Sequence, residues 1–84
     1  MPVLSTLRSV HALETVDGVL ASLMKGAVRT DVDPSSVEYR RDGLIVRVAA
    51  RHGATWIDVS SRGLESGQRI AMQLAQRGIA VEIS

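Results

Sequence analysis

Apolar residues recur every three or four positions over the first third of the chain. This spacing predicts an amphipathic helix over residues 4–29, whose buried stripe consists of Leu7, Val10, Leu13, Val16, Leu20, Leu23 and Ala27. Ser5 or Ser9 is a candidate N-cap, because a hydroxyl there accepts a hydrogen bond from a free backbone amide of the first turn. Gly18 lies inside the pattern and costs up to about 1 kcal/mol against Ala, which predicts a bend or a frayed turn at that point.

The apolar period changes to two in the middle of the chain. Residues 37–41 alternate in polarity and residues 44–48 are mostly apolar, and the two segments flank Asp42-Gly43, the dipeptide that favours a two-residue type I′ hairpin turn. A turn at this place sets a register across the hairpin that pairs Tyr39 with Val46, Val37 with Val48, and Glu38 with Arg47. The last pair joins opposite charges and contributes about 0.2–1 kcal/mol relative to an Ala–Ala pair.

Three further elements are predicted after the hairpin. Residues 54–60 alternate in the manner of a third strand, and a short helix is the competing interpretation. Residues 64–77 show helical spacing and end at Gly78, the residue type that is typical just after a helix C-terminus. Residues 79–83 are predicted to form a closing strand with three inward-facing side chains, those of Ile79, Val81 and Ile83.

This order of elements predicts a single α+β domain over residues 1–84. Two helices must cover the one apolar face of the sheet, which gives a two-layer sandwich. Because the last strand follows a helix, we expect it to lie parallel to and beside the hairpin through a right-handed crossover. That strand carries one charge, Glu82, and a weakly charged edge favours pairing with another chain.

Composition narrows the classes of function. The 84 residues include no Cys, no Phe, one Tyr and one Trp, so the core is expected to be aliphatic, and disulfides and cysteine nucleophiles are excluded. Lys plus Arg total 10 against 9 Asp plus Glu, a net charge of +1, which is weaker than the basic stripe of a nucleic-acid-binding domain. No apolar run approaches the roughly 18 residues that cross a bilayer, so we expect no membrane insertion by this segment.

The residues with catalytic potential do not form a recognisable set. His11 and His52 are the only histidines and lie in different predicted elements, and a zinc site would need two carboxylates from elsewhere. Ser60 or Ser61 with His52 and Asp58 makes a formal triad, but no nucleophile-elbow pattern accompanies it. We therefore expect no enzyme activity and no catalytic residue, and no bound metal.

A glycine-containing segment at residues 63–67 precedes the last predicted helix, where free amides can hold a phosphate. A phosphate-binding loop of the Walker A type ends in Gly-Lys-Ser/Thr, whereas Gln68 and Arg69 follow Gly67 here. Glu65 also repels an anion. The segment is interpreted as a flexible helix entry, and no cofactor is expected.

Outward-facing side chains of the predicted sheet are the candidates for binding a partner. Trp56 alternates out of phase with Ile57 and Val59 and so points away from the core. An exposed Trp is typical of binding hot spots, and packing of this ring across a sheet edge is the alternative. The outer face and the closing strand together supply the predicted interface residues Ile45, Arg47, Trp56, Ile79, Val81 and Ile83.

The segments VEYRRDGLIVRV (37–48) and IAMQLAQRGIAVEIS (70–84) are similar to the hairpin and the ending of a known family. The chain resembles the small ferredoxin-like periplasmic domains of bacterial secretion and pilus platform proteins, above all the C-terminal domain of the type II secretion inner-membrane platform protein L. The resemblance implies a ferredoxin-like fold, a periplasmic location and a non-catalytic role. That role is homodimerisation, or pairing with a partner subunit of similar fold.

A second resemblance applies if residues 54–62 are helical. The chain is then similar to a type II KH RNA-binding domain, which implies a small cytoplasmic protein that binds nucleic acid. The Gly-x-x-Gly loop of that family would fall at residues 60–63 or within residues 63–67. The leading hypothesis is a self-associating protein-interaction module, and the KH-like RNA-binding protein is the alternative.

Overall fold

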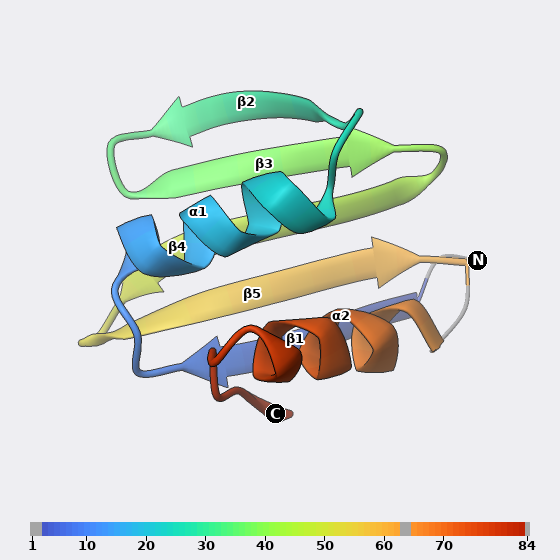
Figure 1. The fold of residues 1–84 in the computed structure, drawn as a ribbon. Coiled ribbons are helices and arrows are strands. Elements are labelled where there is room, and N and C mark those ends of the chain that lie inside the picture. The colour runs from blue at the N-terminus through green and yellow to red at the C-terminus, as the bar shows by residue number, and fades with distance from the viewer. Residues whose placement is uncertain (1–2, 63–64, 84) are drawn as a thin grey trace.

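The computed structural model of this protein describes residues 3–62 and 65–83 (Figure 1). Its elements in chain order are β1 (Val3–Ser9), α1 (Leu13–Leu23), β2 (Val28–Asp33), β3 (Ser36–Arg41), β4 (Leu44–Arg51), β5 (Ala54–Ser61), α2 (Glu65–Gln76) and β6 (Glu82–Ile83). The strands form one antiparallel sheet in the order β2-β3-β4-β5-β1-β6. Both helices lie on the same face of that sheet. The α+β class is therefore confirmed, while the six strands exceed the four that the sequence pattern predicts.

The first 29 residues do not form the single helix predicted for residues 4–29. They form β1, the shorter helix α1 and the start of β2. β1 is inserted between β5 and β6, so its backbone is paired with the far end of the chain. Long-range pairing of this kind overrides the local helical spacing of Leu7 and Val16, which both point into the core in the strand-and-helix arrangement as well.

Neither predicted N-cap serine begins a helix. α1 starts after Ala12, whose side chain makes no capping hydrogen bond. Ser9 instead ends β1, where its Oγ accepts the backbone N–H of His11 at 3.1 Å. Ser5 lies within β1, and α1 continues through Gly18. The helix ends at Leu23.

The β3–β4 hairpin has the predicted register, with Tyr39 opposite Val46, Val37 opposite Val48 and Glu38 opposite Arg47. Asp42 and Gly43 have φ values of 49° and 80°, as a type I′ turn requires. A second turn with positive φ at both central residues, His52 (51°) and Gly53 (74°), joins β4 to β5. Residues 54–60 are accordingly part of a strand, and the competing helical interpretation is wrong.

Helix α2 lies within its predicted bounds of 64–77, and Gly78 follows it with φ at 84°. The backbone N–H groups of Gly78 and Ile79 donate to the carbonyls of Ala75 and Leu74 at 3.1 and 2.9 Å. This pair of bonds is the Schellman motif that closes many helices. It turns Ile79 straight into the core, where 3% of the residue is exposed.

The closing strand is much shorter than the predicted 79–83. β6 contains only Glu82 and Ile83, and it runs antiparallel to β1 beside Leu7 and Arg8. The predicted parallel crossover beside the hairpin is wrong, because β6 pairs antiparallel with β1 at the edge of the sheet, and β5 and β1 separate it from the hairpin. Ile83, predicted to point inward, is 66% exposed.

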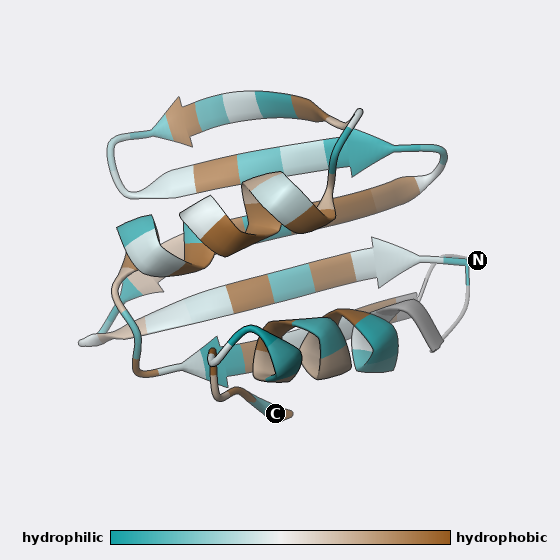
Figure 2. Ribbon diagram, in the orientation of Figure 1, coloured by the Kyte–Doolittle hydropathy of each residue, from teal (hydrophilic) through white to brown (hydrophobic). Residues whose placement is uncertain are grey.

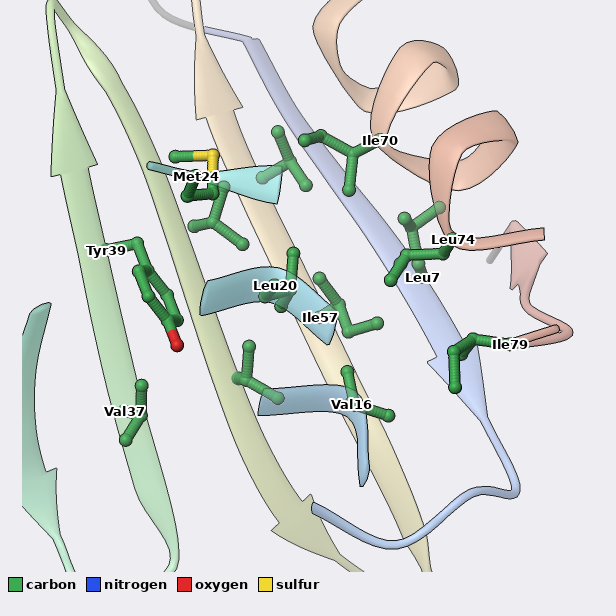
Figure 3. Close-up of a cluster of buried hydrophobic side chains, with 13 residues drawn as sticks. Leu7, Val16, Leu20, Met24, Val37, Tyr39, Ile57, Ile70, Leu74 and Ile79 are labelled. Carbon is green, nitrogen blue, oxygen red and sulfur yellow. The ribbon is translucent and has the colours of Figure 1, made fainter. Parts of the chain in front are cut away.

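The core lies between the sheet and the two helices, with α1 packed on β4 and α2 packed on β1 and β5. Brown apolar positions of both helices face the sheet in Figure 2. Apart from Tyr39 the core is aliphatic, and Figure 3 shows its members, Leu7, Val16, Leu20, Met24, Val37, Tyr39, Val46, Val48, Ile57, Val59, Ile70, Leu74 and Ile79. Neither helix, as far as the structure describes them, has the length and apolar character needed to cross a membrane.

A hydrogen-bonded cluster joins α1 to the β2–β3 side of the sheet. The Tyr39 hydroxyl donates to the Asp17 carboxylate, and Arg29 binds the same carboxylate through Nε at 3.3 Å and Nη2 at 2.7 Å. Burial opposes ionisation of Asp17, but the hydrogen bonds from Arg29 and Tyr39 outweigh it and hold its pKa below the ordinary value. Burial and the bond to Asp17 raise the pKa of Tyr39 to about 12. The cluster therefore keeps Asp17 charged and Tyr39 neutral.

Candidate interaction surface

No element that the structure describes covers the side of the sheet opposite the helices, which we call the outer face (Figure 1). Alternate residues of each strand point to it, because successive side chains of a strand point to opposite faces. The strand pairing arranges them in three rows that run across the sheet. The apolar row is Val28, Arg40, Ile45, Ser60 and Leu4; the charged row is Thr30, Glu38, Arg47, Asp58 and Thr6; the tryptophan row is Asp33, Ser36, Ala49, Trp56, Arg8 and Glu82. The pair Arg51 and Ala54, next to the tryptophan row, also points to the outer face.

Glu38 is the centre of an ion-pair cluster in the charged row. Its two carboxylate oxygens accept from Arg40 Nε at 2.7 Å and from Arg47 Nη2 at 2.9 Å. These two hydrogen bonds hold the pKa of Glu38 below its ordinary value. Only 10% of the Glu38 side chain is exposed, whereas the two arginine side chains remain more than half exposed. The cluster thus presents guanidinium groups to solvent over a covered carboxylate.

Asp58 is the second carboxylate of the charged row, and it is less completely paired. It accepts a hydrogen bond from Thr6 Oγ1 at 3.2 Å, and Arg51 Nη2 lies 4.0 Å from its other oxygen. A carboxylate has acceptor sites for about four hydrogen bonds, and 32% of this side chain is exposed. Asp58 can therefore receive a further donor from outside.

Trp56 lies between two arginines on the outer face. The guanidinium carbons of Arg8 and Arg51 are 6.0 and 5.7 Å from the centroid of its ring, within the range of cation–π attraction. The indole N–H donates to the Arg51 carbonyl at 3.2 Å. Arg8 also forms an ion pair with Glu82 at 3.4 Å. The ring is held in one orientation and remains half-buried.

The apolar row carries hydrophobic side chains that the fold leaves in solvent. Leu4 is 65% exposed and Val28 is 67% exposed, and Ile45 lies half-buried between them. Leu4 and Ile45 line a shallow hollow of about 290 Å³. Its other lining residues are Arg40 and Ser60 of the same row and Glu38, Arg47 and Asp58 of the charged row. Exposed apolar side chains beside ordered charges are typical of a binding surface.

The structure brings together three of the six predicted interface residues. Ile45, Arg47 and Trp56 lie on the outer face of the adjacent strands β4 and β5. Ile79 belongs to the core, so its side chain is not available to a partner. Val81 is half-buried before β6, and Ile83 is exposed at the end of β6.

Leu4, Thr6, Arg8 and Val28 belong to the same surface but were not predicted. They lie in the segment for which the sequence predicts one long helix, so the alternation of inward and outward side chains along a strand is not expected there. The only local signal is the outward series Leu4, Thr6 and Arg8 set against the inward Ser5, Leu7 and Ser9. Serines at inward positions make that signal weak, because strand patterns are recognised by apolar residues on one face.

Both histidines lie at one end of the sheet, where His11 and His52 line a hollow of about 290 Å³ together with Arg51. The residues that the structure describes hold no group of three or more His, Asp or Glu side chains able to bind a metal ion. The formal triad does not assemble. His52 precedes β5, whereas Ser60 lies near its far end, roughly 20 Å away along extended chain.

The segment 63–67 falls partly outside the described residues, which omit Gly63 and Leu64. Gly67 has a packing role, because a Cβ placed on it would lie 2.6 Å from Ser5 Oγ and 2.7 Å from Ser5 Cβ. The absence of a side chain at this position lets α2 approach β1 closely. This role is structural and involves no ligand.

The KH-like interpretation required a helix over residues 54–62, and β5 occupies that segment. The arrangement on which that resemblance rested is therefore not present. No protein-family model matches the chain, and no curated protein sequence matches it either. What this protein does must be argued from its own surface.

Proposed function

We propose that this chain is a non-catalytic protein-interaction module that associates through the outer face of its sheet, either with itself or with a subunit of similar fold. The observation that carries the proposal is the composition of this face. A layer of ordered arginines surrounds one fixed Trp and a row of exposed apolar side chains, and the two helices cover only the opposite face.

The residue types on the outer face are those that protein interfaces favour. Arg and Trp are enriched in interfaces and in binding hot spots, and Lys is depleted. Four arginines lie on this face, Arg8, Arg40, Arg47 and Arg51. The only lysine of the chain, Lys25, follows α1 and lies elsewhere. Most of these arginines are held by carboxylates or by the Trp56 ring, so little side-chain freedom remains to be lost on binding.

The charge of the outer face favours a protein partner over nucleic acid. Four arginines stand among four carboxylates, those of Asp33, Glu38, Asp58 and Glu82, so the positive and negative charges of this face balance. Binding to a phosphate backbone draws on an excess of positive charge, which this face lacks. Because neighbouring side chains on this face carry charges of opposite sign, the face is complementary to a partner surface that also carries both signs of charge.

The arrangement of the elements supports kinship with the ferredoxin-like domains that the sequence resembles. The β-α-β-β-α-β order of that fold is matched if β3 and β4 are taken as two additional strands in the middle of the chain. The pairing role in a bacterial secretion or pilus platform, which the resemblance implies, belongs to this proposal. It would place the domain in the periplasm.

Sedimentation equilibrium over a range of concentrations tests the proposal. We expect the mass of the wild-type chain to rise above 9.0 kDa with concentration, and we expect Ile45→Glu to weaken association by at least about tenfold, or 1.4 kcal/mol. Met72→Glu is the matched control, because Met72 is 63% exposed on α2, in the helical layer. Association that Ile45→Glu leaves intact, or that Met72→Glu abolishes, would show that the outer face is not the contact.

A further inference from the structure

We propose that the partner is a second copy of this chain, packed face to face across a twofold axis that runs parallel to the strands between β4 and β5. This inference rests on the proposed function, because it takes the outer face to be the contact surface. It adds the identity of the partner and the residues that meet across the interface.

The position of the axis follows from the strand order. In the order β2-β3-β4-β5-β1-β6, the boundary between β4 and β5 is the middle of the sheet. A twofold axis there lays β4 over β5 of the second copy and β3 over its β1. An axis at this place gives each of the six strands an opposing strand in the second copy.

The residue contacts follow from the register. Because the axis runs along the strands, each residue keeps its height and faces the residue of the second copy that corresponds to its own cross-strand neighbour. Arg47 and Asp58 are cross-strand neighbours, as are Ala49 and Trp56. Arg47 therefore faces Asp58 of the second copy, and Trp56 faces Ala49 of the second copy. Symmetry repeats both contacts.

These two contacts are complementary in charge and in size. Asp58 has acceptor sites left beyond its bond to Thr6, so it can receive the Arg47 guanidinium of the second copy. Ala49 offers the space that a large ring needs, and large residues facing small ones are how packed layers interdigitate. Aligned sheets pack with a twist of about 30°, which displaces contacts most at the edges of the sheets and at the ends of the strands. The contacts of Arg47, Ala49, Trp56 and Asp58 lie near the middle of the two central strands, β4 and β5.

Neighbouring positions of the axis oppose like charges. An axis through β4 sets Arg47 against its own symmetry mate and Glu38 against Asp58 of the second copy. An axis through β5 sets Asp58 against its own symmetry mate. Like charges across an interface are destabilising. An axis between β3 and β4 avoids this, but it leaves β1 and β6 without an opposing strand.

The size of the face is sufficient for a reversible dimer. Five interstrand spacings of about 4.8 Å and seven residues at about 3.4 Å give a footprint of roughly 570 Å² per copy. Stable interfaces bury about 1,200–2,000 Å² in total, and transient ones lie below that range. Two footprints total about 1,140 Å², just below the stable range, so the dimer should form and dissociate with concentration.

A size exchange between two variants tests this geometry. In Ala49→Trp, the new ring faces Trp56 of the second copy, and we expect at least a tenfold loss of self-association. In Trp56→Ala, the interface has only small residues at both contacts, and we again expect weaker association. A 1:1 mixture places every large ring opposite an Ala, so heterodimers should form in the mixture with close to the wild-type affinity. Native mass spectrometry distinguishes the heterodimer from both homodimers by mass.

Met72→Trp serves as the control, because it adds a Trp to the helical layer and should leave self-association unchanged. If either size variant fails to fold by circular dichroism, the charge exchange of Arg47→Glu mixed with Asp58→Lys replaces it. Each charge variant alone opposes like charges across the axis, and the mixture restores both ion pairs. Recovery in the mixture supports the geometry.

The outcomes separate this inference from the proposed function. A wild-type dimer that Ile45→Glu weakens, with no recovery in either mixture, overturns the axis and leaves the outer face as the contact. A dimer indifferent to Ile45→Glu overturns both. A chain that stays monomeric at millimolar concentration overturns the second copy as partner, and the proposed function then requires a different subunit of similar fold.

Discussion

The hydroxyl of Tyr39 on β3 donates a hydrogen bond to the carboxylate of Asp17 on α1. This contact, together with the ion pair between Asp17 and Arg29 of β2, connects the helical layer to the sheet near its β2 edge. Tyr39 is 2% exposed and the Asp17 side chain is 21% exposed, so the bond is partly buried. Hydrogen bonds to a charged group contribute about 1.5–3 kcal/mol.

Tyr39→Phe should therefore lower the free energy of unfolding by about 1–3 kcal/mol, because the ring still packs while the bond to Asp17 is lost. Urea denaturation at neutral pH measures the difference. The double variant with Asp17→Asn isolates the contact, since removing both partners should cost less than the sum of the two single losses. Strictly additive losses would contradict the coupling.

Stability should fall in acid because three carboxylates, those of Asp17, Asp33 and Glu38, have lowered pKa values. Hydrogen bonds from Arg40 and Arg47 lower the pKa of Glu38. Hydrogen bonds from Arg29 and Tyr39 lower the pKa of Asp17, although burial acts in the opposite direction. A carboxylate whose pKa is lower in the folded state contributes its full stabilisation when the pH is above the pKa of the same group in the unfolded chain, about 4. That stabilisation is lost as the pH falls through the lower folded value.

Urea denaturation from neutral pH to about pH 2 measures this loss. Glu38→Gln should reduce the steepness of the acid limb, because one of the three carboxylates with a lowered pKa is removed. Stability that stays constant below about pH 4 in the wild-type chain would be incompatible with the ion-pair cluster described for Glu38.

The same substitution should have opposite effects in the two helices. Gly18→Ala should stabilise the fold by up to about 1 kcal/mol, since Ala is the better helix former and a Cβ there meets nothing within 4 Å. Gly67→Ala should destabilise it, because its Cβ would lie 2.7 Å from Ser5 Cβ, an atom fixed by the strand backbone. Thermal unfolding of both variants measures the signs. A stabilising Gly67→Ala would show that α2 does not approach β1 so closely.

Trp56 is the only Trp in the chain, so its fluorescence reports on the outer face alone. Acrylamide quenching of the wild-type chain should decrease as the protein is concentrated through the range in which it associates. Arg47→Glu, which weakens the proposed interface, should show quenching that does not depend on concentration. Equal quenching of the wild-type chain at all concentrations, while its mass doubles, would place the contact elsewhere.

Local chemistry explains which parts of the fold the sequence predicts well. The Asp42-Gly43 turn and the alternation on both sides of it determine the hairpin register without reference to the rest of the chain. Gly78 likewise marks the end of α2 through a local Schellman motif. Ile45, Arg47 and Trp56 could be placed on one face because that face follows directly from the strand alternation.

The remainder depends on contacts between distant parts of the chain. β1 is a strand because β5 offers it seven partners, from Val3↔Ser61 to Ser9↔Thr55, and the alternation within residues 4–9 is too weak to predict that strand. The helical spacing of Leu7 and Val16 is equally satisfied by a strand followed by a helix. The sequence therefore does not predict Leu4, Thr6 and Arg8 as surface residues, although they form the part of the outer face that lies on β1.

A dilution series of amide chemical shifts, recorded by NMR, tests most directly whether the outer face is the contact surface. Raising the concentration should shift the amides of β4 and β5 around Arg47, Ala49, Trp56 and Asp58, while the amides of α1 and α2 keep their positions. Shifts confined to the helices, or spectra that do not change up to millimolar concentration, would contradict self-association through this face.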